Sequence, residues 1–248
     1  MKAMLALALA VCLCAAALVA PAQAKMASQK PLRVLVVTGG HDFEREAFTA
    51  MWNGLDGVEW TEAKHPDAHK LLTPEAGKAY DVVALYDMWS PITPEARAAF
   101  AELVRKGKGV VAMHHCLAGY PDWLEYDKII GGRYFERVPA GAPPSLKAST
   151  FADAVPYRVH VADRKHPIVR GIVDFDITDE VYGSFRVEPD SRPLLAATEP
   201  RSGPVIGWTR TYGKARTCYL MLGHDHVAYG DPNFRKLLVQ ALFWAARR

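Results

Sequence analysis

The sequence contains 248 residues, of which 50% are hydrophobic and 23% are charged. This composition excludes an intrinsically disordered chain, a collagen-like chain and a membrane protein with several spans. The formal net charge at pH 7 is only +3. Because no basic run stands out either, we expect no nucleic-acid partner. A chain of this length can form one large hydrophobic core.

The N-terminal segment has the pattern of a secretory signal. Lys2 precedes an almost unbroken apolar run over residues 4–20, and an Ala-x-Ala site follows at residues 22–24. This pattern predicts a signal peptide, residues 1–24, that is removed on export to the periplasm or the medium. A membrane anchor is the alternative, but the run is short and alanine-rich for a span. We expect residues 25–31 to be a short tether and residues 32–248 to be one domain without a membrane span.

Only two cysteines remain after residue 24, Cys116 and Cys218. They could form a disulfide in an oxidising compartment. Both, however, lie in or beside apolar runs that are typical of strands. We therefore expect two free thiols.

In the first half of the domain, predicted strands alternate with predicted helices. Thr93, Pro94 and Glu95 supply an N-cap, a first-turn proline and an early acid to one of these helices. Strands are expected at residues 32–37, 58–63, 80–86 and 109–113, and helices at residues 44–55 and 93–105. This alternation predicts a doubly wound, mainly parallel open α/β sheet.

The second half of the domain is less regular. A helix is expected at residues 122–130, a loop rich in Pro, Ala and Gly at 138–148, and a final amphipathic helix at 233–248. Between them, apolar and β-branched runs predict strands. These lie at residues 157–161, 175–177, 183–187, 194–197, 205–209 and 215–222.

Polar residues cluster directly after the strongest predicted strands. The clusters are GGHD at residues 39–42, DMW at 87–89, HHC at 114–116 and GHDH at 223–226. Ligands bind at the carboxyl edge of an open α/β sheet. We therefore expect ligand contacts from this edge, and in particular from Gly40, His41, Asp42 and Asp87.

Histidine is the prominent residue of these clusters. His41, His114 and His224 are expected at one edge of the sheet, where together they could hold zinc or a similar divalent cation. Each could instead make a separate hydrogen bond to nearby backbone. The chain has no His-Glu-x-x-His and no Cys-x-x-Cys, so this metal site is inferred from the predicted fold. A G-x-G-x-x-G fingerprint and a Walker loop are also absent, and no nucleotide cofactor is expected.

The segment 110–119 has features of a nucleophile elbow, a strained turn from strand to helix. Such a turn needs small residues two positions before and two positions after its tip. A tip at His114 has Ala112 and Cys116 in these places, whereas a tip at Cys116 has His114 and Ala118 and fits poorly. We therefore expect an imidazole at the tip, with Cys116 as a nucleophile kept as the alternative.

A series of motifs over about residues 32–246 resembles the ThuA-like, or trehalose-utilisation, family. They are VVTGGHD (36–42), YDVVALYD (80–87), GKGVVAMHH (107–115), HPIVRGI (166–172), DEVY (179–182), Trp208 with YGKAR (212–216), and LGHD (222–225). The resemblance implies an open sheet similar to class I glutamine amidotransferases and flavodoxin, and a role in carbohydrate metabolism. Motif by motif, His114 stands where the amidotransferase cysteine would be and His224 where its late histidine would be. This departure argues against glutamine hydrolysis.

The same resemblance suggests which residues form the site. Glu180 is expected to line a sugar site as a base or a ligand, although an acidic turn before a strand is usually only solvated. Tyr182 is expected to contact the sugar, Trp89 to stack on it, and His166 to be a further contact unless Pro167 merely holds it in an extended loop. The expected catalytic residues are His114, His115, Glu180, His224 and Asp225.

The leading interpretation is an exported enzyme that acts on a small carbohydrate, either a glycoside or a keto-sugar. It would be a hydrolase, lyase or isomerase, in which a divalent cation polarises a carbonyl or activates water and Glu180 or a histidine moves the proton. Two alternatives stay open. One is a sugar-binding or regulatory module without activity, and the other is a Cys116-dependent hydrolase of the amidotransferase type.

Overall fold

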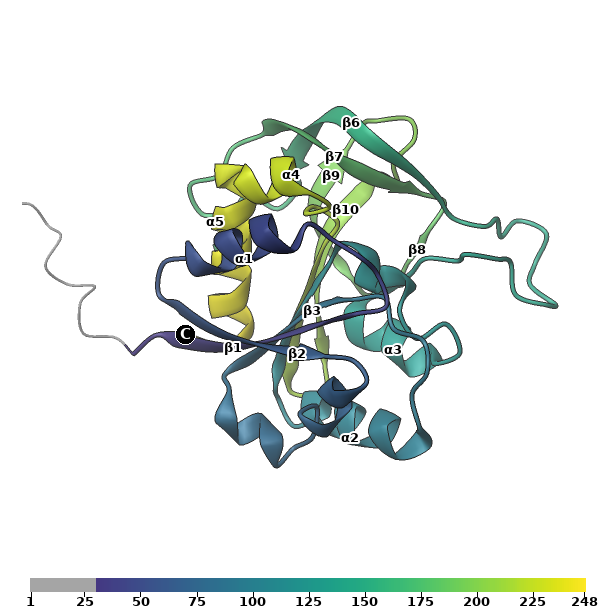
Figure 1. The fold of residues 1–248 in the computed structure, drawn as a ribbon. Coiled ribbons are helices and arrows are strands. Elements are labelled where there is room, and N and C mark those ends of the chain that lie inside the picture. The colour runs from purple at the N-terminus through teal and green to yellow at the C-terminus, as the bar shows by residue number, and fades with distance from the viewer. Residues whose placement is uncertain (1–29) are drawn as a thin grey trace, which may run out of the picture. The chain divides into compact units, whose positions relative to one another are not determined.

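The computed structural model describes residues 30–248, and Figure 1 shows their path. Pro31–Arg248 forms one compact unit. The predicted signal peptide and all but the last two residues of the predicted tether lie outside the described residues. Within the described part of the chain, no helix has both the length and the apolar character that a membrane span requires.

A nine-stranded sheet forms the centre of the domain, in the order β2-β1-β3-β4-β11-β10-β9-β6-β7. Its strands are β1 (Leu32–Gly39), β2 (Val58–Lys64), β3 (Val82–Asp87), β4 (Gly109–Met113), β6 (Thr150–Val161), β7 (Phe175–Gly183), β9 (Arg192–Ala197), β10 (Val205–Tyr212) and β11 (Ala215–Leu220). The short strands β5 (Gly132–Arg133) and β8 (Arg186–Val187) pair separately.

The sheet has a parallel part and an antiparallel part. The strands from β2 to β11 pair in parallel, which confirms the predicted fold class. The strands from β10 to β7 pair antiparallel. Since β9 and β7 are each separated from β11 by an even number of antiparallel pairings, they run in the same direction as the parallel strands. The carboxyl end of β7 therefore lies toward the same edge of the sheet as the carboxyl ends of β4 and β11.

Helices cover both faces of the sheet (Figure 1). On one side, α4 (His226–Gly230) contacts both α1 (Arg45–Asn53) and α5 (Pro232–Ala245), and α5 packs on β3, β4 and β11. On the other side lie α2 (Pro94–Arg105) and α3 (Leu124–Ile130), which also contact each other. Because both faces are covered, every residue of β3 and β4 is buried. This burial explains their unbroken apolar sequences.

The second half differs from the sequence prediction in two places. The strand expected at 157–161 begins at Thr150, and the acidic motif expected in a turn before a strand lies inside β7. The first half of β6 consists mostly of exposed residues and Pro156 follows it, so this part of the strand lacks an apolar pattern. Its strand structure comes from pairing with β7, which supplies the backbone partners. Both remaining cysteines, Cys116 and Cys218, are free, as expected.

Candidate metal centre and adjoining cavity

His114 lies at the tip of a strained turn. β4 ends at Met113, a 3₁₀ turn begins at His114, and His114 itself has φ 52°. For a residue other than glycine this left-handed conformation costs about 1–2 kcal/mol. Two hydrogen bonds hold the residue in place, because Tyr219 Oη donates to the His114 carbonyl at 2.9 Å and His114 Nδ1 donates to the Met221 carbonyl at 2.7 Å. The predicted elbow is present, and its tip is an imidazole.

His224 is positioned through a carboxylate from another strand. It follows Gly223, which has φ 110°, in the turn after β11. The Asp179 carboxylate accepts hydrogen bonds from the backbone amides of Gly223 at 2.7 Å and His224 at 3.0 Å, and from Glu180 N at 2.9 Å. Asp179 is buried, and it ties the turn after β11 to β7.

The contact of Asp179 with Gly223 also shows how the sheet brings Glu180 to the centre. In a flat sheet, β7 and β11 would lie roughly 19 Å apart, because three strands separate them at about 4.8 Å per step. The turn after β11 and the Asp179 side chain span this separation together, helped by the twist of the sheet. Glu180 follows Asp179 on β7 and faces His114 and His224.

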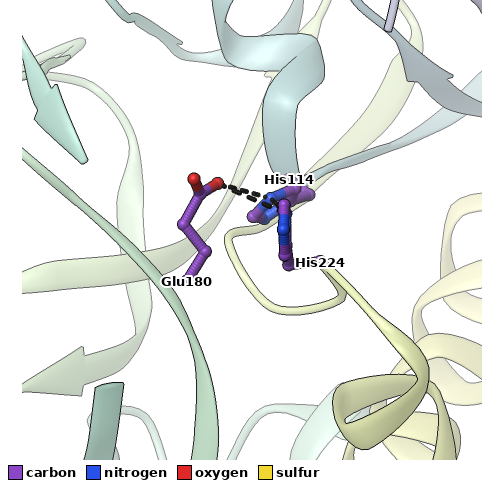
Figure 2. A group of neighbouring side chains, drawn as sticks. All are labelled: His114, Glu180 and His224. Atoms are coloured by element: carbon purple, nitrogen blue, oxygen red, sulfur yellow. Dashed lines mark hydrogen bonds and ion pairs between the residues drawn. The ribbon is translucent and has the colours of Figure 1, made fainter. Parts of the chain in front are cut away.

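The three side chains converge on one point (Figure 2). His114 Nε2 lies 3.0 Å from His224 Nδ1 and 2.9 Å from Glu180 Oε2, and His224 Nδ1 lies 3.5 Å from the same oxygen. Two nitrogens and one oxygen bound to zinc at about 2.1 Å in a tetrahedral arrangement would lie about 3.4 Å apart. The residues present therefore fit a divalent cation with three protein ligands.

The hydrogen bonds of His114 orient its Nε2 toward the other two side chains. Because Nδ1 of His114 donates to the Met221 carbonyl, neutral His114 has its only lone pair on Nε2. That nitrogen nevertheless has three polar neighbours, since Tyr182 Oη also lies 2.8 Å away. A lone pair, a carboxylate oxygen and a second imidazole nitrogen repel one another unless a proton or a cation lies among them. A backbone carbonyl on the other ring nitrogen is also the usual way in which a metal-binding histidine is oriented.

The electrostatics of the centre are unbalanced toward negative charge. Burial opposes ionisation of Glu180, but contact with His114 outweighs it and lowers the pKa of Glu180 to about 2. Burial likewise opposes protonation of His114, while Glu180 and Asp179 raise its pKa. Within residues 30–248, no lysine or arginine is among the main electrostatic partners of Asp153, Asp179 or Glu180. The positive charge that balances these carboxyl groups must therefore come from a protonated histidine or from a bound cation.

A cavity of about 580 Å³ adjoins the centre. Glu180 and Tyr182 belong both to the centre and to the cavity wall. The wall combines aromatic and polar side chains and contains His41, Met88, His115, Ala118, Tyr134, Glu136, Ser149, Thr150, Phe151, Glu180 and Tyr182. Its volume is within the range of small-molecule sites.

His41 and His115 line this cavity without joining the cluster. Among the described residues, the group close enough to hold a metal ion is His114, Glu180 and His224. The expected set of His41, His114 and His224 is therefore changed at one position, where Glu180 replaces His41. The His41 ring stacks on His115 with centroids 4.6 Å apart. Burial lowers the pKa of His115 well below its usual value, so His115 is a neutral wall residue.

In the cluster after β3, Met88 lines the cavity, whereas Asp87 and Trp89 contact His65. The buried Asp87 carboxylate lies 2.9 Å from His65 Nε2, and Trp89 stacks on the His65 ring at 5.2 Å. Trp89 is thus an interior contact of His65, and neither it nor Asp87 is part of the cavity wall. Gly40 is required by packing, because a Cβ there would lie 2.2 Å from the Met88 carbonyl. Asp42 is exposed beside it, and its carbonyl is a partner of the His41 ring.

Two further expected site residues stabilise helical ends. The Asp225 carboxylate accepts from the amides of Val227 and Ala228 and is the N-cap of α4. His166 Nδ1 accepts from the Ile168 amide and its ring packs on Trp244, away from the cavity wall. Both were reasonable candidates because a polar residue beside a glycine or proline has the same sequence pattern in a cap and in a site.

Cys116 does not face the cavity. Its side chain is fully buried, and burial raises the pKa of its thiol well above the usual value. A nucleophilic cysteine needs an accessible thiolate. The structure therefore gives no support to a Cys116-dependent hydrolase.

Several wall residues were missed by the sequence prediction. Tyr134, Glu136, Ser149, Thr150 and Phe151 come from the two ends of the loop predicted at 138–148. Phe151 is 62% exposed although it is a large apolar residue. An aromatic residue close to a loop was the available signal, but its strand pairing with Tyr182 could not be read locally.

Comparisons with known proteins agree with this fold. A family model described as ThuA, trehalose utilisation, matches residues 33–245. No curated protein matches the sequence. A ThuA-like protein from Parabacteroides merdae ATCC 43184 is 22% identical with a TM-score of 0.72, over 88% of this chain and 90% of that one.

Two other solved structures share the fold. A ThuA-like protein from Bacteroides uniformis ATCC 8492 is 22% identical with a TM-score of 0.67, over 88% of this chain and 93% of that one. A β-galactosidase from Bacillus circulans is 11% identical with a TM-score of 0.53, over 85% of this chain but only 30% of the enzyme. At these identities the likeness shows the fold alone.

Proposed function

This chain belongs to the ThuA family, whose model is described as trehalose utilisation. On this premise we propose that it is an enzyme that acts on a small carbohydrate with the help of a divalent cation. The cation would be held by His114, Glu180 and His224. The observation that carries the proposal is the convergence of two imidazole nitrogens and one carboxylate oxygen beside a cavity. Three protein ligands and one open position are typical of catalytic zinc sites.

The bound cation would supply Lewis acidity, which polarises a carbonyl or hydroxyl oxygen of the substrate. The protein residues have separate tasks. The Met221 carbonyl fixes the His114 ring so that Nε2 faces the centre. Asp179 orients His224 through the backbone, and Tyr182 Oη, 2.8 Å from His114 Nε2, can move a proton at the edge of the cavity.

The cavity wall suits a sugar. Phe151 and Tyr182 face each other across β6 and β7, and Tyr134 packs edge-on against Tyr182 at 5.3 Å. Aromatic faces bind the apolar side of a sugar ring, while Glu136 and Thr150 offer hydrogen-bond partners for hydroxyl groups. Keto-sugars and glycosides are the preferred substrate classes, because both present an oxygen that a cation can polarise.

Metal analysis and a substrate panel test the proposal together. Protein purified without chelator is expected to contain about one equivalent of a divalent cation, and His114→Ala and His224→Ala are expected to lose it. His226→Ala is the matched control, because His226 lies in the same turn but pairs with Glu44 outside the cluster. Disaccharides and their keto forms should be converted by the loaded protein and not after chelation.

The outcomes separate the alternatives. Absence of bound cation in the wild-type protein at saturating zinc would refute the metal centre. Sugar binding without conversion by the loaded protein would favour the sugar-binding module instead.

We also propose export, supported by the N-terminal pattern of Lys2 and the apolar run. Mature protein from the native host should then begin near residue 25, and an intact N-terminus in the cytosol would contradict it.

A further inference from the structure

Asp153 lies on the same face of the sheet as the metal centre, although no motif marks it. In the β6–β7 pair, Phe151 is opposite Tyr182, Ala152 is opposite Val181 and Val155 is opposite Asp179. Two residues of β6, Asp153 and Ala154, therefore lie opposite the single residue Glu180. This is the pattern of a β-bulge, a feature common beside active sites.

The bulge changes which residues of β6 face the core. Beyond it, Val155 and Val159 are buried, in line with Asp179 on the partner strand. Before it, Phe151 is 62% exposed and faces the cavity with Tyr182. In a regular strand all three would share one face, because side chains alternate with a period of two. The extra residue lets the strand place Val155 in the core and keep Asp153 opposite Glu180.

The backbone is strained at the bulge. Ala154 has φ 50°, a left-handed conformation that alanine adopts rarely. Asp153 and Glu180 lie opposite each other on the paired strands, and the Glu180 carboxyl is the main interaction partner of the Asp153 carboxyl. Like charges directly opposite each other on paired strands are destabilising, so a bulge that brings two carboxyl groups together needs a compensating positive charge.

We propose that Asp153 supports cation binding at this centre by placing a second carboxylate beside the ligand Glu180. The inference rests on the proposed metal centre, and it adds a residue outside the three ligands. Carboxylates that contact metal ligands typically change metal affinity 10- to 100-fold when they are removed. Asp153 is expected to act within that range.

Zinc affinity measured by competition with a chromophoric chelator tests this role without a substrate. Asp153→Asn should weaken Zn²⁺ binding about 10- to 100-fold, and Asp153→Glu should recover part of the loss. The matched control is Asp176→Asn, which removes an exposed carboxylate of the same strand pair that contacts only Arg158 at 3.0 Å. Its Zn²⁺ affinity should stay within about twofold of the wild type. Thermal unfolding of each cation-free variant checks that the fold is intact.

Each outcome is decisive for one of the two proposals. If Asp153→Asn binds Zn²⁺ as tightly as the wild type, the role of Asp153 is refuted and the three-ligand centre stands. If the Asp176 control weakens binding equally, general surface charge explains the effect and the role of Asp153 is again refuted. If the wild-type protein binds no Zn²⁺, the metal centre itself is wrong and the inference falls with it.

Discussion

The elbow conformation of His114 predicts an unusual order of stability between two substitutions. Both His114→Gly and His114→Ala remove the ring, its hydrogen bond to Met221 and its contact with Glu180. These losses are the same in both variants and cancel when the two are compared. What remains is the backbone, which has φ 52° at this residue.

The magnitude follows from two opposing effects. Alanine in the left-handed region costs about 1–2 kcal/mol. Glycine has no such strain, but it loses about 0.5–1 kcal/mol more conformational entropy on folding. At the midpoints of these ranges the glycine variant is more stable by about 0.75 kcal/mol, which corresponds to a melting temperature about 1.5–3 °C higher for a domain of this size.

Thermal and urea unfolding in the presence of chelator measure the difference, because a bound cation would add its own stabilisation to the folded state. Ala99→Gly is the control, since Ala99 lies inside α2 (Pro94–Arg105). Glycine should destabilise there by about 1 kcal/mol, the opposite sign. If His114→Ala proves as stable as His114→Gly, the tip is not in a left-handed conformation and the elbow is wrong. We also expect His114→Ala to be less stable than the wild type. A residue at the edge of a sheet ordinarily packs little, but the His114 ring is fully buried.

Three further predictions concern the surroundings of the centre. Asp179→Ala should destabilise the cation-free protein by about 3 kcal/mol in urea unfolding, because the amides of Gly223 and His224 lose their acceptor; a loss below about 1 kcal/mol would contradict this. Since the pKa of Glu180 is lowered from 4.5 to about 2, its ionised form stabilises the fold above pH 4.5, and that contribution disappears as the pH falls toward 2. Glu180→Gln should flatten this part of the stability curve without cation, and an unchanged slope would refute the pairing with His114. Phe151→Ala should raise KM for the sugar several-fold while the melting temperature stays within about 1 °C, and an unchanged KM would exclude stacking.

The parallel strands and the elbow were predictable because their causes are local. β3 and β4 are covered on both faces, so their sequences are continuous apolar runs that end abruptly at a polar residue. The elbow needs small residues around its tip, and Ala112 and Cys116 meet that requirement in the sequence itself. Glu180, in contrast, was expected from a resemblance to a family. Its own sequence surroundings suggested only an acidic turn.

The cavity wall was beyond local reasoning because it depends on pairing between distant segments. Phe151 faces Tyr182 only because β6 pairs with β7 in one particular register. The exposed first half of β6 has no apolar alternation, so nothing in residues 150–156 indicates a strand. The bulge at Ala154 shifts that register by one residue, and it is visible only in the paired strands.

By itself, the sequence determined the order of strands and helices, the carboxyl edge where the site lies, and His114 and His224 as residues of that edge. The tertiary structure decided which third residue joins them. His41 and Asp87 also follow core strands, but His41 stacks on His115 and Asp87 is paired with His65. Glu180 reaches the centre instead, beside Asp179, which ties β7 to the turn after β11. The apolar pattern of a strand encodes its burial, whereas the distance between side chains on strands far apart in the sheet depends on the twist and register of every strand between them.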